Sequence, residues 1–146
     1  MKTSAGTPGY MIAKYEAFPR EIKTLPLSND QLLLRAFHNA HPGFIPDFIC
    51  ENTTILNGSV DKNHAGNFRS VVYRDGEAIW AFYCLDAALF DPGDELESRW
   101  TNDNHYFFYS ANGCTAVIWK VGGCYDALVG KSPLDAILEY AETIRR

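Results

Sequence analysis

The residue best suited to acid–base chemistry is His105, near the start of the aromatic stretch WTNDNHYFFYSANGCTAVIW at residues 100–119. A neighbouring carboxylate such as Asp103 can raise the pKa of an imidazole and orient its ring. Covalent catalysis would also need a nucleophile, and the sequence has neither a Gly-x-Ser-x-Gly elbow nor a cysteine in a known catalytic context. We therefore predict no catalytic residue, interpret His105 as structural or solvent-exposed, and favour a protein that is not an enzyme.

Cysteine and histidine spacing argues against a metal centre. Structural zinc sites usually contain a Cys-x-x-Cys pair, and none is formed by the four cysteines, Cys50, Cys84, Cys114 and Cys124. His38, His41 and Cys50 would supply three ligands without a credible fourth. We predict no metal ion, and we expect the cysteines of a protein in a reducing compartment to act as small buried hydrophobic residues.

The residues Gly130, Lys131 and Ser132 match the end of a phosphate-binding loop. The first glycine of that motif would have to stand five positions before Gly130, where the sequence has Tyr125. This mismatch excludes the motif, and we predict no nucleotide or other cofactor.

The segment DAALFDPGDELESRWTND at residues 86–103 is strongly acidic, with Arg99 as its single cation. A group of carboxylates attracts a basic protein, and buried aromatic side chains supply much of the affinity at interfaces. The predicted partner-binding residues are Phe90, Asp91, Asp94, Glu95, Glu97, Trp100 and Asp103. The alternative interpretation is a solvated loop that joins two hairpins.

Three functions are compatible with these residues. We favour a non-catalytic protein-binding module for a basic partner protein, comparable in size and charge to an inhibitor, an immunity-type protein or a chaperone-like protein. The first alternative is a small-molecule-binding protein or small enzyme with a pocket at the aromatic sheet face, lined by His105, Tyr106, Tyr109 and Trp119. The second is a homodimer or larger homo-oligomer, such as a structural or phage-type assembly protein, that pairs an apolar sheet face with its own copy.

The net charge of −5 is unevenly distributed along the chain. Residues 1–74 have eight basic and six acidic side chains, a balance of +2, whereas residues 75–146 have five basic and twelve acidic ones, a balance of −7. Proteins that bind nucleic acid usually present a basic stripe to the phosphates, and none is visible here. We therefore expect no binding to nucleic acid or to an anionic membrane.

The length of 146 residues is typical of one domain with a substantial core. The longest apolar runs, such as AIWAFYCL, are shorter than the roughly 18 residues that a membrane helix needs. The N-terminal residues lack the continuous apolar core of a secretory signal. These features lead us to expect a cytoplasmic protein.

Two hairpins should flank the acidic segment and hold most of the aromatic residues around it. Asp75 and Gly76 suit a type I′ turn, which would place Val72 opposite Ile79. We expect a strand over residues 48–56 before this hairpin, ending at a turn, and a loop over residues 61–67.

The second hairpin turns at Asn112 and Gly113, which would place Tyr109 opposite Ala116. Both of its faces are largely apolar and should be covered. Residues 124–129 would add a short fifth strand.

We expect one helix before the strands in the sequence and one after them. Residues 1–9 resemble a flexible arm, residues 10–18 are a weak candidate for a strand, and Ser28 with Gln31 forms a capping box for a helix that ends near residue 40. Ser132 and Pro133 should start a C-terminal helix with one apolar stripe. The prediction is a single α+β domain over residues 10–146, with an N-terminal helix, an antiparallel sheet of about four or five strands built from two hairpins, and a C-terminal helix packed on the sheet.

Overall fold

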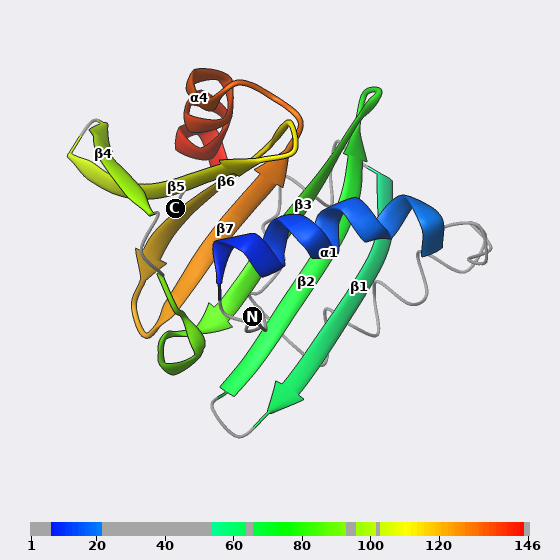
Figure 1. The fold of residues 1–146 in the computed structure, drawn as a ribbon, viewed down its shortest axis with the longest axis horizontal. Coiled ribbons are helices and arrows are strands. Elements are labelled where there is room, and N and C mark those ends of the chain that lie inside the picture. The colour runs from blue at the N-terminus through cyan, green and yellow to red at the C-terminus, as the bar shows by residue number, and fades with distance from the viewer. Residues whose placement is uncertain (1–6, 22–53, 64–65, 93–95, 102, 145–146) are drawn as a thin grey trace.

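The computed structural model describes residues 7–21, 54–63, 66–92, 96–101 and 103–144. Within this part of the chain, seven strands form one antiparallel sheet of order β1-β2-β3-β7-β6-β5-β4, accompanied by two α-helices (Figure 1). The elements are α1 (Pro8–Glu21), β1 (Thr54–Asn63), β2 (Gly66–Asp75), β3 (Ala78–Asp86), the 3-10 helix η3 (Ala87–Leu89), β4 (Glu97–Thr101), β5 (Asn104–Ala111), β6 (Cys114–Val121), β7 (Cys124–Gly130) and α4 (Leu134–Ile144). The α+β class is confirmed, but the sheet is larger than predicted. The expected helix at residues 28–40 lies outside the described residues.

The sheet consists of two antiparallel meanders joined at one pair of strands. The first meander is β1-β2-β3 and the second is β4-β5-β6-β7. They meet where β3 pairs with β7, with Ala81 opposite Val129 and Leu85 opposite Tyr125. The chain between β3 and β4 therefore leads from the middle of the sheet to one of its edges.

The β5–β6 hairpin has the predicted register, with Tyr109 opposite Ala116 and Ala111 opposite Cys114. Asn112 and Gly113 have φ angles of 55° and 79°. Positive φ at both central residues is the pattern of a type I′ turn, so the turn prediction is confirmed as well.

The β2–β3 turn was predicted one position too early. Asp75 pairs with Ala78, so Gly76 and Glu77 form the loop, and Val72 faces Ala81. Gly76 has a φ of 65° whereas Glu77 is not among the residues with positive φ, a pattern typical of a type II′ turn with glycine at its first central position. Each residue's partner moves by two positions, and side chains alternate with a period of two, so the predicted faces are retained.

The first strand also differs from the prediction. β1 continues through Asn57 and Gly58, which were expected to turn, and its register against β2 shifts between Ile55 and Asn57. A bulge of this kind lets a strand continue past one extra residue. The expected loop at residues 61–67 is wrong too, because β1 extends to Asn63 and β2 begins at Gly66.

Helix α1 replaces the strand expected at residues 10–18. The Thr7 hydroxyl accepts a hydrogen bond from the backbone N–H of Tyr10 at 3.2 Å, and the Thr7 carbonyl accepts one from Met11. Thr7 is thus an N-cap, and Pro8 occupies the first helical position, where its missing N–H costs nothing. Pro8 lies within the segment expected to be a flexible arm, of which residues 1–6 lie outside the described residues.

The two helices belong to opposite faces of the sheet. Helix α1 crosses one face in the front of Figure 1, and α4 belongs to the cluster on the other face. The core under α1 includes Met11, Ile12, Tyr15, Phe68, Val72, Tyr83 and Ile118. The core under α4 includes Tyr73, Phe82, Val117, Trp119, Ile137, Leu138 and Ala141. Neither helix, nor any other in the described ranges, is long and apolar enough to cross a bilayer.

Replacing Gly130 with alanine should destabilise the fold, because an added Cβ would lie 2.4 Å from ring carbons of Trp80. Overpacking a rigid ring of this kind costs about 1–3 kcal/mol. The measurement is urea unfolding of Gly130→Ala beside Gly123→Ala, whose added Cβ would meet no atom within 4 Å. Equal free energies of unfolding for the two variants would show that the Trp80 ring does not rest on Gly130.

Candidate functional site

The acidic segment contains an edge strand of the sheet. β4 pairs on one side with β5, with Glu97 opposite Phe108 and Trp100 opposite His105. No strand of the described chain pairs with its other side. The alternative of a solvated loop over residues 86–103 is therefore wrong for the five residues of β4.

Trp100 begins a row of rings on the α1 side of the sheet. Its side chain is 69% exposed and stacks on His105, with ring centroids 4.6 Å apart and planes inclined by 11°. The ring centroid of His105 lies 4.7 Å from that of Phe107, and the Phe107 centroid lies 6.2 Å from that of Phe90. Phe90 stacks on Tyr125 at 4.2 Å. These five residues, called here the aromatic row, connect the two predicted anchors Phe90 and Trp100.

The 3-10 helix η3 places Phe90 on this row. The Ala87 N–H donates to the Gly123 carbonyl at 3.0 Å, which fastens the chain leaving β3 to the β6–β7 turn. The Phe90 N–H then donates to the Ala87 carbonyl at 3.2 Å. Two backbone bonds therefore turn the chain so that the Phe90 ring meets Tyr125.

The α4 side of β4 is held by polar contacts with α4. Arg99 forms an ion pair with Asp135 at 2.8 Å and lies 5.8 Å from the centre of the Phe108 ring. Asn104 donates to a carboxylate oxygen of Glu142 at 2.9 Å, and the Tyr106 hydroxyl donates to the same oxygen. These contacts fix β4 and β5 against the helix.

The carboxylates predicted for partner binding are distributed around β4. Asp91, Glu97 and Asp103 are exposed, whereas Asp94 and Glu95 lie outside the described residues. Arg99 is the single arginine or lysine of residues 86–111, and it is engaged by Asp135. The exposed charge of the β4 edge is therefore mainly negative.

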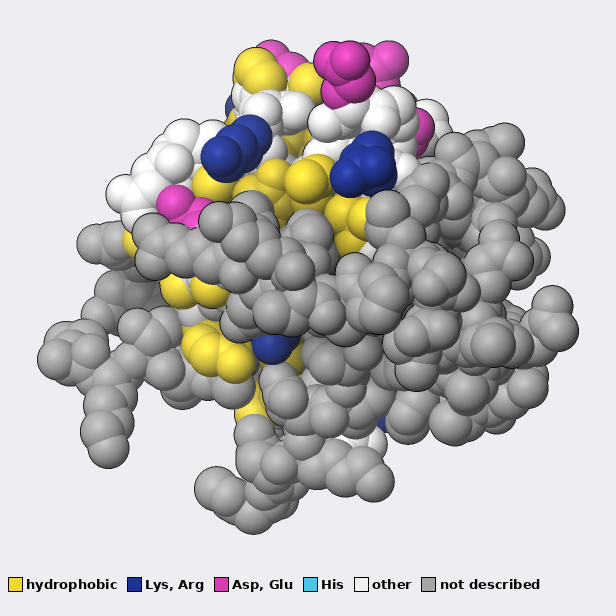
Figure 2. Space-filling view, turned by 90° about the vertical axis from the view of Figure 1, so that its right-hand side faces the viewer, with side chains coloured by type: hydrophobic (Ala, Val, Ile, Leu, Met, Phe, Trp, Pro, Cys, Tyr) yellow, Lys and Arg dark blue, Asp and Glu magenta, His cyan; other side chains and the backbone are white. Residues whose placement is uncertain are grey.

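On the side of the molecule opposite the β4 edge, Figure 2 shows lysine or arginine side chains of the described residues beside hydrophobic ones, with acidic side chains at the upper end.

The four residues of the alternative aromatic pocket do not share one surface. Tyr106 and Trp119 are buried under α4, at 0% and 1% exposure, with ring centroids 5.8 Å apart. His105 and Tyr109 alternate with Tyr106 along β5 and so lie on the α1 side. The sheet separates the two pairs, because neighbouring residues of a strand point to opposite faces.

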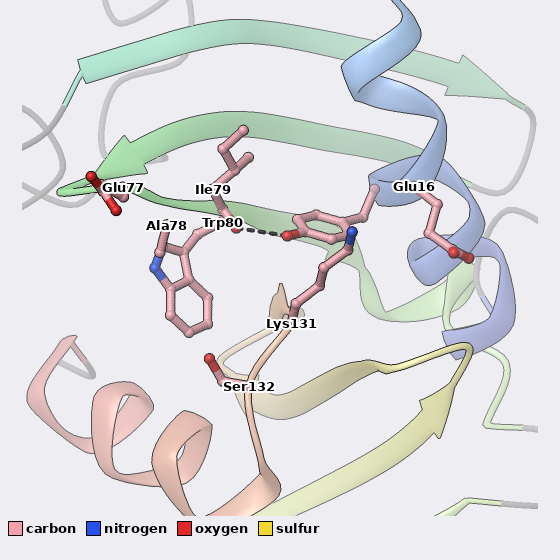
Figure 3. Close-up of a pocket in the computed structure, with 8 residues that line it drawn as sticks. Glu16, Glu77, Ala78, Ile79, Trp80, Lys131 and Ser132 are labelled. Carbon is pink, nitrogen blue, oxygen red and sulfur yellow. Dashed lines mark hydrogen bonds between the residues drawn. The ribbon is translucent and has the colours of Figure 1, made fainter.

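The structure contains a cavity of about 400 Å³ in a different place (Figure 3). It is lined by Tyr15, Glu16, Glu77, Ala78, Ile79, Trp80, Lys131 and Ser132. The Tyr15 hydroxyl donates to the Ile79 carbonyl at 2.7 Å, and burial raises the pKa of Tyr15 to about 12. Figure 3 shows the Lys131 side chain extending toward α1 and Ser132 beneath Trp80. Sequence reasoning missed this site because its residues come from three distant segments.

A polar cluster lies where β2, β3 and β7 meet. Arg69 forms an ion pair with Asp86 at 3.3 Å, and the Asn67 N–H donates to Asp86 at 2.9 Å. The thiols of Cys84 and Cys124 lie 3.8 Å from Arg69 and Asp86, respectively. Asp86 thus belongs to this partly buried cluster rather than to the β4 surface.

The Cys84 thiol of this cluster is poorly suited to nucleophilic or metal chemistry. Burial, reinforced by the nearby Asp126, raises the pKa of the Cys84 thiol far above its usual range. The thiol stays protonated at neutral pH and is a poor nucleophile or metal ligand. Within the described ranges, no three His, Cys, Asp or Glu side chains are placed to hold a metal ion. Cys84, Cys114 and Cys124 are free thiols.

Comparison of the chain with protein-family models, with curated proteins and with solved structures finds no match.

Asp86 should stabilise the fold in a pH-dependent manner. The Asn67 N–H, followed by Arg69, lowers the pKa of this carboxyl below its ordinary value. The contribution of the ionised Asp86 to the free energy of unfolding is therefore complete above the unfolded pKa of about 3.9. It is lost as the pH falls through the lower folded pKa. Because the side chain is one third exposed, solvent screening limits the loss in Asp86→Asn to about 0.5–1 kcal/mol at pH 7.

Urea unfolding of the unaltered protein and of Asp86→Asn across the acid range measures the difference between their free energies of unfolding. This difference should be constant at neutral pH and vanish below the folded pKa of Asp86. A difference that grows as the pH falls would contradict the assignment.

Proposed function

We propose that this chain is a non-catalytic protein-binding module that engages a basic partner protein at the β4 edge. The surface combines the aromatic row with the exposed carboxylates of Asp91, Glu97 and Asp103, to which the sequence adds Asp94 and Glu95. The observation that supports this proposal best is Trp100, which is 69% exposed yet stacked on His105.

An exposed tryptophan is suited to anchor a partner. Covering its ring would gain about 2 kcal/mol of hydrophobic free energy. Stacking on His105 holds the ring in place, so binding would lose little side-chain entropy. Val121 is the other large hydrophobic side chain found exposed in the described ranges, at 45%.

The charge of the β4 edge favours a basic partner. Residues 75–146 have a balance of −7, and Arg99, the one cation of β4, is paired with Asp135. A negative field accelerates the approach of a basic protein and disfavours an acidic one. The resulting affinity should fall as salt is added, because exposed charges are screened.

A basic protein captured from host extract should lose affinity when this surface is altered. Trp100→Ala should raise its Kd about thirtyfold, equivalent to about 2 kcal/mol. Combined replacement of Glu97 by Gln and Asp103 by Asn should raise the Kd about tenfold at low salt and less at high salt. Isothermal titration calorimetry measures both changes.

The matched control is Glu77→Gln, which removes one exposed carboxylate at the β2–β3 turn. It should change the Kd by less than about twofold. A partner that binds all of these variants equally, or that has no excess of basic residues, would contradict the proposal.

A second candidate function is small-molecule binding in the cavity beside Trp80. The observation in its favour is the combination of an indole wall, the Lys131 ammonium and two rim carboxylates around a volume of about 400 Å³. Such a mixed lining suits a compact zwitterionic ligand with an apolar body, whose anionic group would meet Lys131.

Native mass spectrometry of gently purified protein tests this candidate. A co-purifying small molecule should be lost in Lys131→Met, whose side chain has similar length without the charge, and retained in Trp100→Ala. A molecule retained in Lys131→Met, or the absence of any bound molecule, would contradict small-molecule binding at this site.

A further inference from the structure

In the part of the chain that the structure describes, no strand pairs with the backbone groups that two residues of β4 present to the open edge. Thr101 lies opposite Asn104, so the β4–β5 turn has a two-residue loop. The residues that flank such a loop form a hydrogen-bonded pair, and such pairs alternate along an antiparallel ladder. The N–H and C=O groups of Thr101, Arg99 and Glu97 therefore point to β5, whereas those of Ser98 and Trp100 point to the open edge.

The two faces beside this edge differ in chemistry. Glu97 lies on the α4 side, where the guanidinium of Arg99 is already paired with Asp135 and so leaves the Glu97 carboxylate uncompensated by β4. Ser98 and Trp100 lie on the α1 side, at the end of the aromatic row. A strand added to β4 would alternate its side chains between these two faces. Basic side chains would suit the first face and apolar ones the second.

We infer that the basic partner binds as an extended segment that adds to β4 as an eighth strand, with lysine or arginine alternating with apolar residues. This inference rests on the proposed function and specifies how the same surface is used. Its main-chain bonds would be made by Ser98 and Trp100, and its apolar residues would cover the Trp100 ring. Strand addition to an exposed sheet edge is a recurring mode of peptide recognition.

Charge favours a basic partner over a second copy of this chain. Two copies paired through β4 would bring together two segments that each have five carboxylates and one arginine at residues 91–103. That arginine, Arg99, is already bound to Asp135. Like charges placed opposite one another destabilise a strand pair, whereas a lysine-containing strand would complement the same groups.

The experiment uses a fluorescein-labelled peptide, Thr-Lys-Val-Lys-Val-Lys-Thr amide, as the probe and measures its Kd by fluorescence anisotropy. Ser98→Pro removes an N–H from the open edge without removing a bond to β5, a position where proline is tolerated in edge strands. It should raise the Kd at least about tenfold. Ser98→Ala, which keeps the N–H, should change it by less than about twofold.

Two N-methylated peptides test the same contact without altering the protein. In a strand, the N–H groups of alternate residues point to the same side, so methylation of the valine nitrogens or of the lysine nitrogens should block only one set. One methylated peptide should lose about tenfold in affinity while the other binds like the parent. Equal affinities of the two peptides would overturn the inference even if Ser98→Pro fails to fold.

The outcomes separate this inference from the proposed function. Binding that depends on Glu97, Asp103 and Trp100 but is unchanged by Ser98→Pro and by both methylations would overturn strand addition alone. Binding that is insensitive to all of these changes, or no binding at millimolar peptide, would overturn both. A dimer of the free protein that Ser98→Pro dissociates, detected by sedimentation, would replace the basic strand with a second copy.

Discussion

The antiparallel pairing of β3 with β7 is the interaction on which the rest of the structure depends. It joins the meander β1-β2-β3 to the meander β4-β5-β6-β7, so that seven strands share one ladder. Both faces of the central strands then become apolar core: Tyr83 is fully buried toward α1, and its neighbour Phe82 is 2% exposed toward α4. A sheet that is apolar on both faces needs a cover on each, and α1 and α4 occupy opposite faces accordingly.

The same pairing determines where the candidate site lies. Because β7 is adjacent to β3, the chain leaving β3 must pass to the edge of the sheet before β4, β5, β6 and β7 can follow in order. That connection turns at η3 and places Phe90 on Tyr125. It then enters β4, whose Trp100 reaches the other end of the aromatic row. The acidic and aromatic residues meet at one edge as a consequence of strand order.

Local signals predicted the parts of this fold that depend on neighbouring residues. Asn112 and Gly113 both have positive φ, so the pair specified the β5–β6 turn and its register. The β4 strand carries Glu, Ser, Arg and Thr around one tryptophan, a pattern without apolar alternation, and its identity depends on pairing with β5. Helix α1 has a usable signal in Thr7 and Pro8, but the apolar residues that follow favour a strand when they are considered alone. The β3–β7 pairing and the cavity beside Trp80 join distant segments, which no short-range pattern can specify.

Helix α4 influences the β4 edge through one ion pair. The Arg99–Asp135 pair is exposed, with 45% and 90% of the two side chains accessible, so its contribution to folding free energy is small. The ion pair has a larger effect on surface charge, because Asp135 compensates Arg99, the single cation of β4, on the α4 side of the sheet. Asn104 and Tyr106 fix β5 to Glu142 of the same helix. A partner would therefore meet a strand already ordered and negatively charged, and association would not have to supply the free energy of arranging it.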